Sequence, residues 1–186
     1  MPFGAGRASG RRRGPPARDA AGTPRADARP ARSLKSRAIA LLARREYSRA
    51  ELRARLLGPG ARHDPDATAA VDAVLEELAA AGYLSDARYA EAMVKRKAGA
   101  YSRRAIADTL AAQGVARETI GAALDDAPVD DAQAMRALWE RRFGRPAANE
   151  REKARQIRFL QSRGFGLSAI IAFLRKLPLQ SDDDAT

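Results

Sequence analysis

Basic side chains are the residues of this sequence whose types and spacing could do chemistry, and that chemistry would be the binding of anions. Arg151, Arg155 and Arg158 fall at i, i+4 and i+7, so a helix would place all three on one face. The planar guanidinium group pairs in a bidentate manner with carboxylates and phosphates. The candidate partner-binding residues are Arg88, Lys95, Arg96, Lys97, Arg103, Arg104, Arg151, Lys153, Arg155, Arg158 and Arg163.

Residues that could carry out catalysis are sparse. His63 is the single histidine and lies in a segment rich in glycine and proline, and the chain has no cysteine. Neither a GxxxxGK[ST] phosphate loop nor a GxGxxG motif is present. The acidic runs Asp125-Asp126, Asp130-Asp131 and Asp182 to Asp184 fall at predicted helix edges and in a tail, where we expect them to be solvated. The sequence therefore predicts a binding protein and not an enzyme, with no cofactor and no metal.

The charge of the chain favours a polyanionic partner, or a partner that is itself bound to a polyanion. The formal net charge is +11, and residues 1–34 carry eight arginines against two aspartates. That basic tail is either a solvated linker or a segment that adds non-specific nucleic-acid affinity. Without cysteine or an apolar run long enough to span a bilayer, we expect a cytoplasmic monomer that does not enter a membrane.

The elements that must position these residues are predicted to be helices, because alanine and leucine dominate the apolar residues. Ser48 with Glu51 forms a capping-box pattern, in which each side chain satisfies a free backbone amide at a helix start. Ser102 is a second predicted N-cap, and Gly114 is a predicted helix stop. Over residues 86–97 the spacing predicts a helix with Tyr89, Ala92, Met93 and Arg96 on one face.

The helices recur as a repeat. Tyr47 to Leu52 is matched by Tyr101 to Ile106, and Leu110 to Val115 is matched by Leu160 to Phe165. A helical unit that recurs along the chain indicates a repeat array, and a unit this small is expected to stack on its neighbours to bury its core. The predicted organisation is a disordered basic tail at 1–33, three-helix repeats at 34–84, 85–128 and 129–178, and a frayed acidic C-terminus at 179–186.

Two motifs resemble a known family. Leu84-Ser85-Asp86-Ala87-Arg88-Tyr89-Ala90, followed by Gly99, Ile106, Leu110 and Gly114-Val115, resembles the central motif of bacterial RecX regulatory proteins. The segment from Ile157 to Phe165, with Ile170 and Leu174 after it, is similar to that family's third-repeat motif. The resemblance covers about residues 34–177. Gly166 departs from it, since the family often has a serine N-cap there.

The resemblance implies an all-α fold of three tandem three-helix units in an elongated, curved array. It also implies binding to the RecA recombinase filament on single-stranded DNA, with inhibition of its ATPase, strand-exchange and coprotease activities. Homologous recombination, DNA repair and the SOS response would be the setting, and single-stranded DNA would be met directly or through the filament. Two alternatives stay open: a direct DNA-binding helical module without a RecA role, and a passive scaffold for other proteins.

Overall fold

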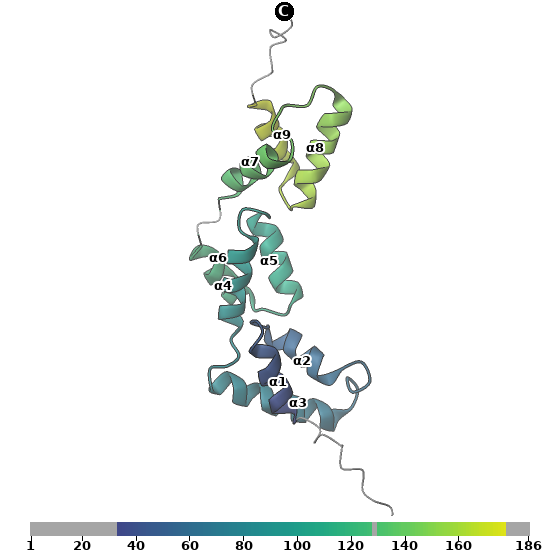
Figure 1. Cartoon of the computed structure of the whole chain (residues 1–186), viewed down its shortest axis with the longest axis vertical. Coiled ribbons are helices and arrows are strands. Elements are labelled where there is room, and N and C mark those ends of the chain that lie inside the picture. Colours follow the sequence, from purple (N-terminus) through teal and green to yellow (C-terminus); the bar gives the residue numbers. More distant parts are fainter. Residues whose placement is uncertain (1–32, 128–129, 178–186) are drawn as a thin grey trace, which may run out of the picture. The chain divides into compact units, whose positions relative to one another are not determined.

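The computed structural model describes residues 33–127 and 130–177, and these residues form nine α-helices and no strand (Figure 1). The predicted all-α fold of three-helix repeats is confirmed. The predicted tail, apart from Ser33, and the predicted frayed C-terminus lie outside the described residues. The helices are α1 (Leu34–Leu42), α2 (Arg49–Leu57), α3 (Pro65–Ala80), α4 (Asp86–Lys97), α5 (Arg103–Ala112), α6 (Arg117–Asp125), α7 (Asp131–Arg142), α8 (Glu150–Ser162) and α9 (Leu167–Arg175).

Local sequence sets most of these boundaries. The side chains of Ser48 and Ser102 accept hydrogen bonds from backbone amides in the first turns of α2 and α5, as the sequence predicts. The other half of the predicted capping box is not formed, because the Glu51 carboxylate pairs with Arg45 instead of reaching back to the helix start. Gly166 begins α9 without a side-chain cap. Gly114 follows α5 with a φ of 75°, a left-handed conformation that other residues adopt only with strain. None of the helices in the described residues is long and apolar enough to cross a membrane.

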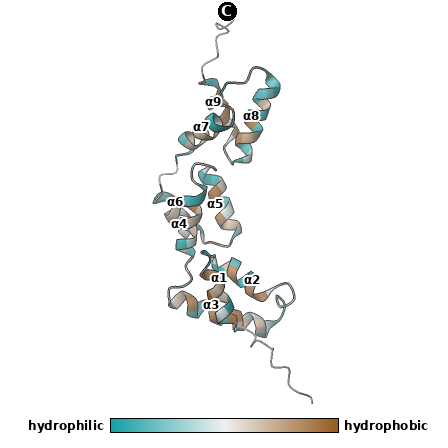
Figure 2. Cartoon of the chain, viewed as in Figure 1, coloured by the Kyte–Doolittle hydropathy of each residue, from teal (hydrophilic) through white to brown (hydrophobic). Residues whose placement is uncertain are grey.

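Each group of three helices encloses its own apolar core. The cores of the first (α1–α3), second (α4–α6) and third (α7–α9) units are separate clusters, although the sequence suggested that a unit would need its neighbours. Figure 2 shows hydrophobic stretches in the helices of all three groups, separated by polar ones. The side chains with less than 2% exposure are mainly aliphatic: Leu52, Val71, Leu75, Leu78, Val94, Ile106, Leu110, Leu160 and Ile170.

The buried face of α4 is wider than the sequence predicted. Tyr89 and Met93 are buried as expected, but Ala90 and Val94 are buried with them, whereas Ala92 is exposed. The reason is that α4 contacts both α5 and α6, so two adjacent strips of its surface point inward. Burial raises the pKa of the Tyr89 hydroxyl above its ordinary value. Tyr89 is thus a core residue of the second unit.

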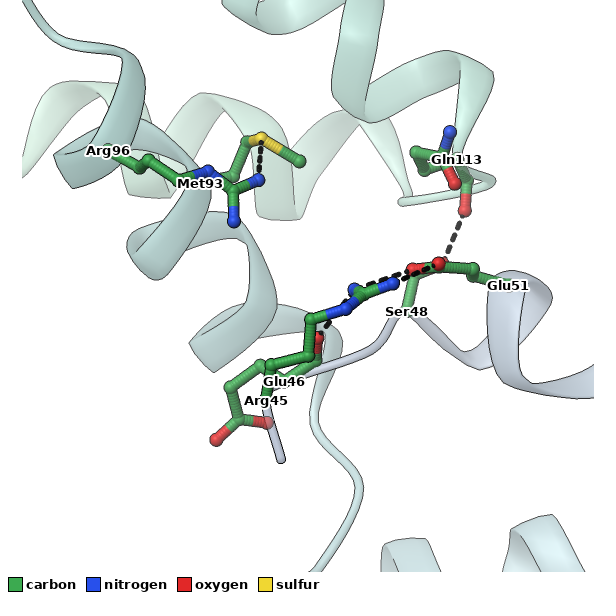
Figure 3. A network of polar contacts seen from close by, with 7 residues as sticks. All are labelled: Arg45, Glu46, Ser48, Glu51, Met93, Arg96 and Gln113. Atoms are coloured by element: carbon green, nitrogen blue, oxygen red, sulfur yellow. Dashed lines mark hydrogen bonds and ion pairs between the residues drawn. The ribbon is translucent and has the colours of Figure 1, made fainter. Parts of the chain in front are cut away.

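The first and second units meet at the N-terminus of α2. The Ser48 hydroxyl accepts a hydrogen bond from the Glu51 amide at 3.0 Å and donates one to the carbonyl oxygen of Gln113 at 2.7 Å (Figure 3). The Arg49 amide donates to a carboxylate oxygen of Asp86, at the start of α4, at 2.7 Å. Backbone groups at helix ends, which have no partner inside their own helix, therefore hold this junction together.

The second and third units meet in the same way at the N-terminus of α5. The Ser102 hydroxyl accepts from the Ala105 amide at 3.1 Å and donates to the carbonyl oxygen of Gly164 at 2.8 Å. The Arg103 amide donates to Asp131, the first residue of α7, at 2.7 Å. The residues that recur in the sequence are thus the residues that join one unit to the next.

Candidate functional site

The predicted basic cluster at the corner between α4 and α5 begins with three residues in the last turn of α4. Lys95 and Arg96 are exposed, and Lys97 is half-buried. Arg96 donates a hydrogen bond to the sulfur of Met93 at 3.0 Å (Figure 3), while the Lys97 ammonium lies 4.6 Å from the centre of the Tyr101 ring. Positive charges in this turn also interact favourably with the helix dipole. Lys95 is exposed and forms no ion pair with a described residue.

Arg103 and Arg104 are adjacent in sequence but differ in their surroundings. The Arg103 guanidinium donates to the carbonyl oxygen of Leu124 at 2.6 Å and forms an ion pair with Asp125. The Arg104 side chain is 85% exposed and its only ion pair among the described residues is a 3.7 Å contact with Asp108. Arg103 therefore ties α5 to the end of α6, whereas Arg104 is available to a partner.

Arg88 and Arg163 are used inside the molecule, one at each junction. Arg88 donates to Glu46 at 2.9 Å and to the carbonyl oxygen of Tyr83 at 3.1 Å, so it helps join the first and second units. Arg163 donates a hydrogen bond to the Tyr101 hydroxyl at 2.8 Å. Its guanidinium carbon Cζ also lies 5.0 Å from the centre of the Tyr101 ring and 5.4 Å from the centre of the Phe159 ring. Arg88 and Arg163 therefore each bond one three-helix unit to the preceding one.

The arginine row predicted on α8 is confirmed as a row on the exposed side of that helix. Arg151, Arg155 and Arg158 are exposed and line one surface depression together with Asn149 and Glu152. None of the three forms an ion pair with a described residue. Lys153, on a different side of α8, pairs with Glu150 at 3.1 Å.

Two further arginines adjoin this row, and the sequence reasoning missed them. Arg142 at the end of α7 and Arg145 in the following loop are exposed and line a second depression with Arg155 and Glu152. A signal was present in the sequence, since this loop leads directly into α8. We call the five residues Arg142, Arg145, Arg151, Arg155 and Arg158 the α8 arginine patch.

Glu152 is the acidic residue that lines both depressions, and its carboxylate is engaged at the start of α8. It accepts a hydrogen bond from the Ala148 amide at 3.0 Å, while the Glu152 amide donates to the Asn149 side chain at 2.9 Å. This arrangement resembles a capping box, except that the carboxylate accepts from the residue before the N-cap and not from Asn149 itself. The carboxylate is thus directed toward the helix N-terminus and forms no ion pair with the α8 arginine patch.

Gln156 positions the loop that carries Arg145. Its side chain is buried, accepts a hydrogen bond from the Trp139 indole at 2.9 Å and donates one to the carbonyl oxygen of Arg145 at 3.2 Å. A buried amide with both ends bonded has a defined orientation. The core of the third unit therefore fixes the backbone from which one arginine of the patch projects.

Three arginines of the first unit form ion pairs within that unit, in contrast to the patch. Arg45 pairs with Glu51 at 2.5 Å, Arg49 with Glu76 at 2.7 Å, and Arg53 with Asp72 at 2.6 Å. The hydrogen bond from Arg53 holds the pKa of the Asp72 carboxyl below its ordinary value, and raises the pKa of Arg53. These three arginines are therefore engaged within the first unit, whereas no arginine of the α8 arginine patch forms an ion pair with a described residue.

Among the described residues, no group of three or more histidine, cysteine, aspartate or glutamate side chains could hold a metal ion. His63 lies exposed in the loop between α2 and α3.

Comparisons with known proteins agree with this architecture. The model of the second three-helix domain of RecX matches residues 85–124, and the model of the third three-helix domain of RecX matches residues 130–174. The chain also resembles the crystal structure of RecX from Lactobacillus salivarius, with a TM-score of 0.56 and 16% identity over 77% of this chain and 94% of that chain. The fold defines an all-α protein built from repeated three-helix units.

Curated relatives settle the family. The regulatory protein RecX of Leptothrix cholodnii is 44% identical over 158 residues, which cover 85% of this chain and 98% of the relative. The regulatory protein RecX of Ralstonia pickettii is 41% identical over 140 residues, covering 74% of this chain and 84% of the relative. The chain belongs to the RecX family of regulatory proteins.

Proposed function

We propose that this protein binds the RecA recombinase filament on single-stranded DNA and inhibits its ATPase, strand-exchange and coprotease activities. The observation that carries the proposal is the 44% identity to a regulatory protein RecX across nearly all of that relative. The three-helix units and the exposed basic surface are consistent with it. The action is regulation by binding, through positioned charges on a rigid helical scaffold.

The residues proposed to contact the filament are exposed basic residues in and beside the two predicted clusters. They are Lys95 and Arg104 on the second unit and the α8 arginine patch on the third. Arg88 and Arg163 support this surface from the junctions, and Arg103 supports it from within the second unit. Exposed arginines attract carboxylates and phosphates over distances of about 8 Å at physiological salt, so they would speed docking and orient it.

The test is the rate of ATP hydrolysis by RecA on single-stranded DNA, with this protein added from far below stoichiometric amounts. We expect strong inhibition at low ratios, because one bound molecule would block several RecA protomers. Inhibition that appears only when the protein saturates the DNA would favour the DNA-binding module that competes for the strand. No inhibition at any ratio would reject the proposal.

A matched pair of variants tests the assignment of the surface. Arg104→Glu removes an exposed arginine in an i,i+4 pair with Asp108, and Arg136→Glu removes one in a similar pair with Glu140, outside the proposed surface. We expect Arg104→Glu to weaken inhibition and Arg136→Glu to leave it unchanged. Equal effects of the two variants would show that net charge, and not position, is what matters.

A further inference from the structure

An apolar groove with a volume of about 550 Å³ lies between α8 and α9 in the third unit. Its apolar lining includes Ile157 of α8 and Ile171 and Leu174 of α9, and all three side chains are half-buried. Clefts of about 300–1,000 Å³ with a mainly apolar lining are those in which proteins hold a bound group. The groove can therefore take an apolar side chain of a docked segment.

The helix that forms one wall of this groove is less covered than its counterparts in the other units. The third helices of the first and second units, α3 and α6, each bury three apolar side chains. In the described part of the chain α9 fully buries only Ile170, and Leu167 is 48% exposed. Burial of apolar surface stabilises a protein by about 25 cal/mol per Å². A segment that covered α9 would therefore be stabilised by apolar burial.

The segment that follows α9 in the chain starts at the groove itself. Leu177, the last residue that the structure describes, lines the groove and packs against the core of the third unit. Leu179 follows two residues later, a span of at most about 7 Å. A tether this short gives a segment an effective concentration on the order of millimolar at its site. This segment is therefore favoured over a second copy of the chain or a separate protein at micromolar concentration.

The charges around the groove suit the rest of the segment. Lys153 and Arg175 line the groove together with one acidic residue, Glu150, which already pairs with Lys153 at 3.1 Å. Arg175 is exposed and forms no ion pair with a described residue. The acidic run Asp182 to Asp184 begins five residues after Leu177, at most about 18 Å along an extended chain. Three carboxylates are thus tethered close to the Arg175 guanidinium group.

We propose that residues 178–186 of this chain fold back and dock in the groove between α8 and α9. Leu179 lies against Ile157 and Ile171, and the acidic run lies beside Arg175. The docked segment is an intramolecular strap that covers the apolar face of α9, so a protein partner must displace it to reach that face. The inference goes beyond the proposed function, and its test needs no RecA.

The experiment uses the full chain with isotope-labelled leucine and isoleucine methyl groups. The measurement is the nuclear Overhauser effect (NOE) between the methyl groups of Leu179 and those of Ile157 and Ile171. Leu179→Ser identifies the Leu179 signals and is also the test variant. Gln180→Ser is the matched control, because Gln180 is the neighbouring side chain and has no part in the docking. Neither variant changes a residue of the three cores, so both proteins should fold.

We expect NOEs from Leu179 to Ile157 and Ile171 in the wild type. In Leu179→Ser the methyl signals of both isoleucines should shift. The Tm, followed by the fluorescence of Trp139, should fall by about 2–4 °C, the change expected for the loss of one partly buried leucine. Gln180→Ser should leave the signals and the Tm as in the wild type. Absence of the NOEs, or equal changes in the two variants, would overturn the inference.

The same measurement distinguishes the other possible occupants of the groove. In a sample that mixes labelled and unlabelled chains, NOEs between molecules would show that the segment of a second copy fills the groove, and the inference would be lost. Isoleucine signals that are identical in the wild type and in Leu179→Ser would mean that the groove is left for a separate protein, which would also overturn it.

The charged part of the inference is tested with Asp182→Asn/Asp183→Asn/Asp184→Asn. We expect the side-chain signals of Arg175 to shift in this variant, because the carboxylates beside the guanidinium group are lost. Arg104, which lies in the second unit and is also an exposed arginine, is the internal control and should keep its signals. Arg175 signals that stay as in the wild type would overturn the placement of the acidic run.

Discussion

The hydroxyl of Ser102 donates a 2.8 Å hydrogen bond to the carbonyl oxygen of Gly164, across the junction between the second and third units. The same hydroxyl caps α5 by accepting from the Ala105 amide. Ser48 repeats this relationship one unit earlier, with Gln113 and Glu51. One serine per junction thus serves both as a helix cap and as a joint, and the separate apolar cores are linked through polar backbone groups.

Ser102→Ala should therefore destabilise the protein more than the loss of an ordinary cap. Loss of the cap costs about 1 kcal/mol, and the Gly164 carbonyl oxygen, left without its donor, adds about 1–3 kcal/mol. Ser85→Ala is the control, because Ser85 caps α4 without a bond across a junction. Urea unfolding measures the free energy of unfolding of both variants. Equal losses for the two variants would mean that the junction bond contributes nothing.

Gly114→Ala and Gly164→Ala should each destabilise the junction that they line. Their φ angles are 75° and 90°, and a Cβ at Gly114 would lie 2.5 Å from the Cβ of Ala50. A Cβ at Gly164 would meet Ala105 in the same way. Backbone strain and overpacking together predict a loss of about 2–4 kcal/mol for each variant.

The control for these two variants is Gly121→Ala. Gly121 lies inside α6 with open space around its Cα, so alanine should stabilise the helix by up to about 1 kcal/mol. Thermal unfolding followed by circular dichroism compares the three. A neutral effect of alanine at Gly114 and Gly164 would contradict the close packing of the junctions.

Arg103 and Arg104 should separate stability from binding. Arg103→Gln removes the bonds to the Leu124 carbonyl oxygen and to Asp125, and we expect a loss of about 1 kcal/mol in the free energy of unfolding. Arg104→Gln should change stability by less than about 0.5 kcal/mol, since its ion pair is solvent-exposed. Chemical denaturation of both variants checks this. A larger loss of stability in Arg104→Gln than in Arg103→Gln would show that the structural role is assigned to the wrong arginine.

Gln156→Ala should destabilise the third unit. The variant leaves the buried Trp139 indole N–H without an acceptor and frees the Arg145 carbonyl oxygen, at a cost of about 2–3 kcal/mol. Trp139 is the single tryptophan, so its fluorescence reports on this unit. Gln161→Ala is the control, because Gln161 is an exposed residue of the same helix. Unfolding curves of Gln156→Ala and Gln161→Ala that coincide would refute the role of Gln156.

The Asp72 carboxyl should titrate below its ordinary pKa of 3.8 in the folded protein, because Arg53 donates hydrogen bonds to both of its oxygens. A lowered pKa in the folded state means that this pair stabilises the protein above pH 3.8, and that the stabilisation is lost as the pH falls through the lower value. In Arg53→Gln the pKa of Asp72 should move up toward 3.8. Carboxyl chemical shifts followed by NMR measure it, and an identical pKa in both proteins would exclude Arg53 as the cause.

Local features of the chain were predictable from the sequence. Ser48 and Ser102 were identified as caps and Gly114 as a helix stop, because capping and left-handed turns depend on residues within one turn of each other. The recurrence of Tyr47 to Leu52 at Tyr101 to Ile106 indicated the repeat for the same reason. The arginine row on α8 followed from helical periodicity alone.

Tertiary structure decided how these local features are used. Neighbours on a helix point about 100° apart, so Arg103 reaches α6 while Arg104 faces solvent, and nothing in their sequence context distinguishes them. Arg142 and Arg145 join the patch because the loop before α8 folds back along it. The sequence determined which residues recur, but only the packing of one unit on the next brought Ser102 to Gly164, because that contact joins helix ends 62 residues apart.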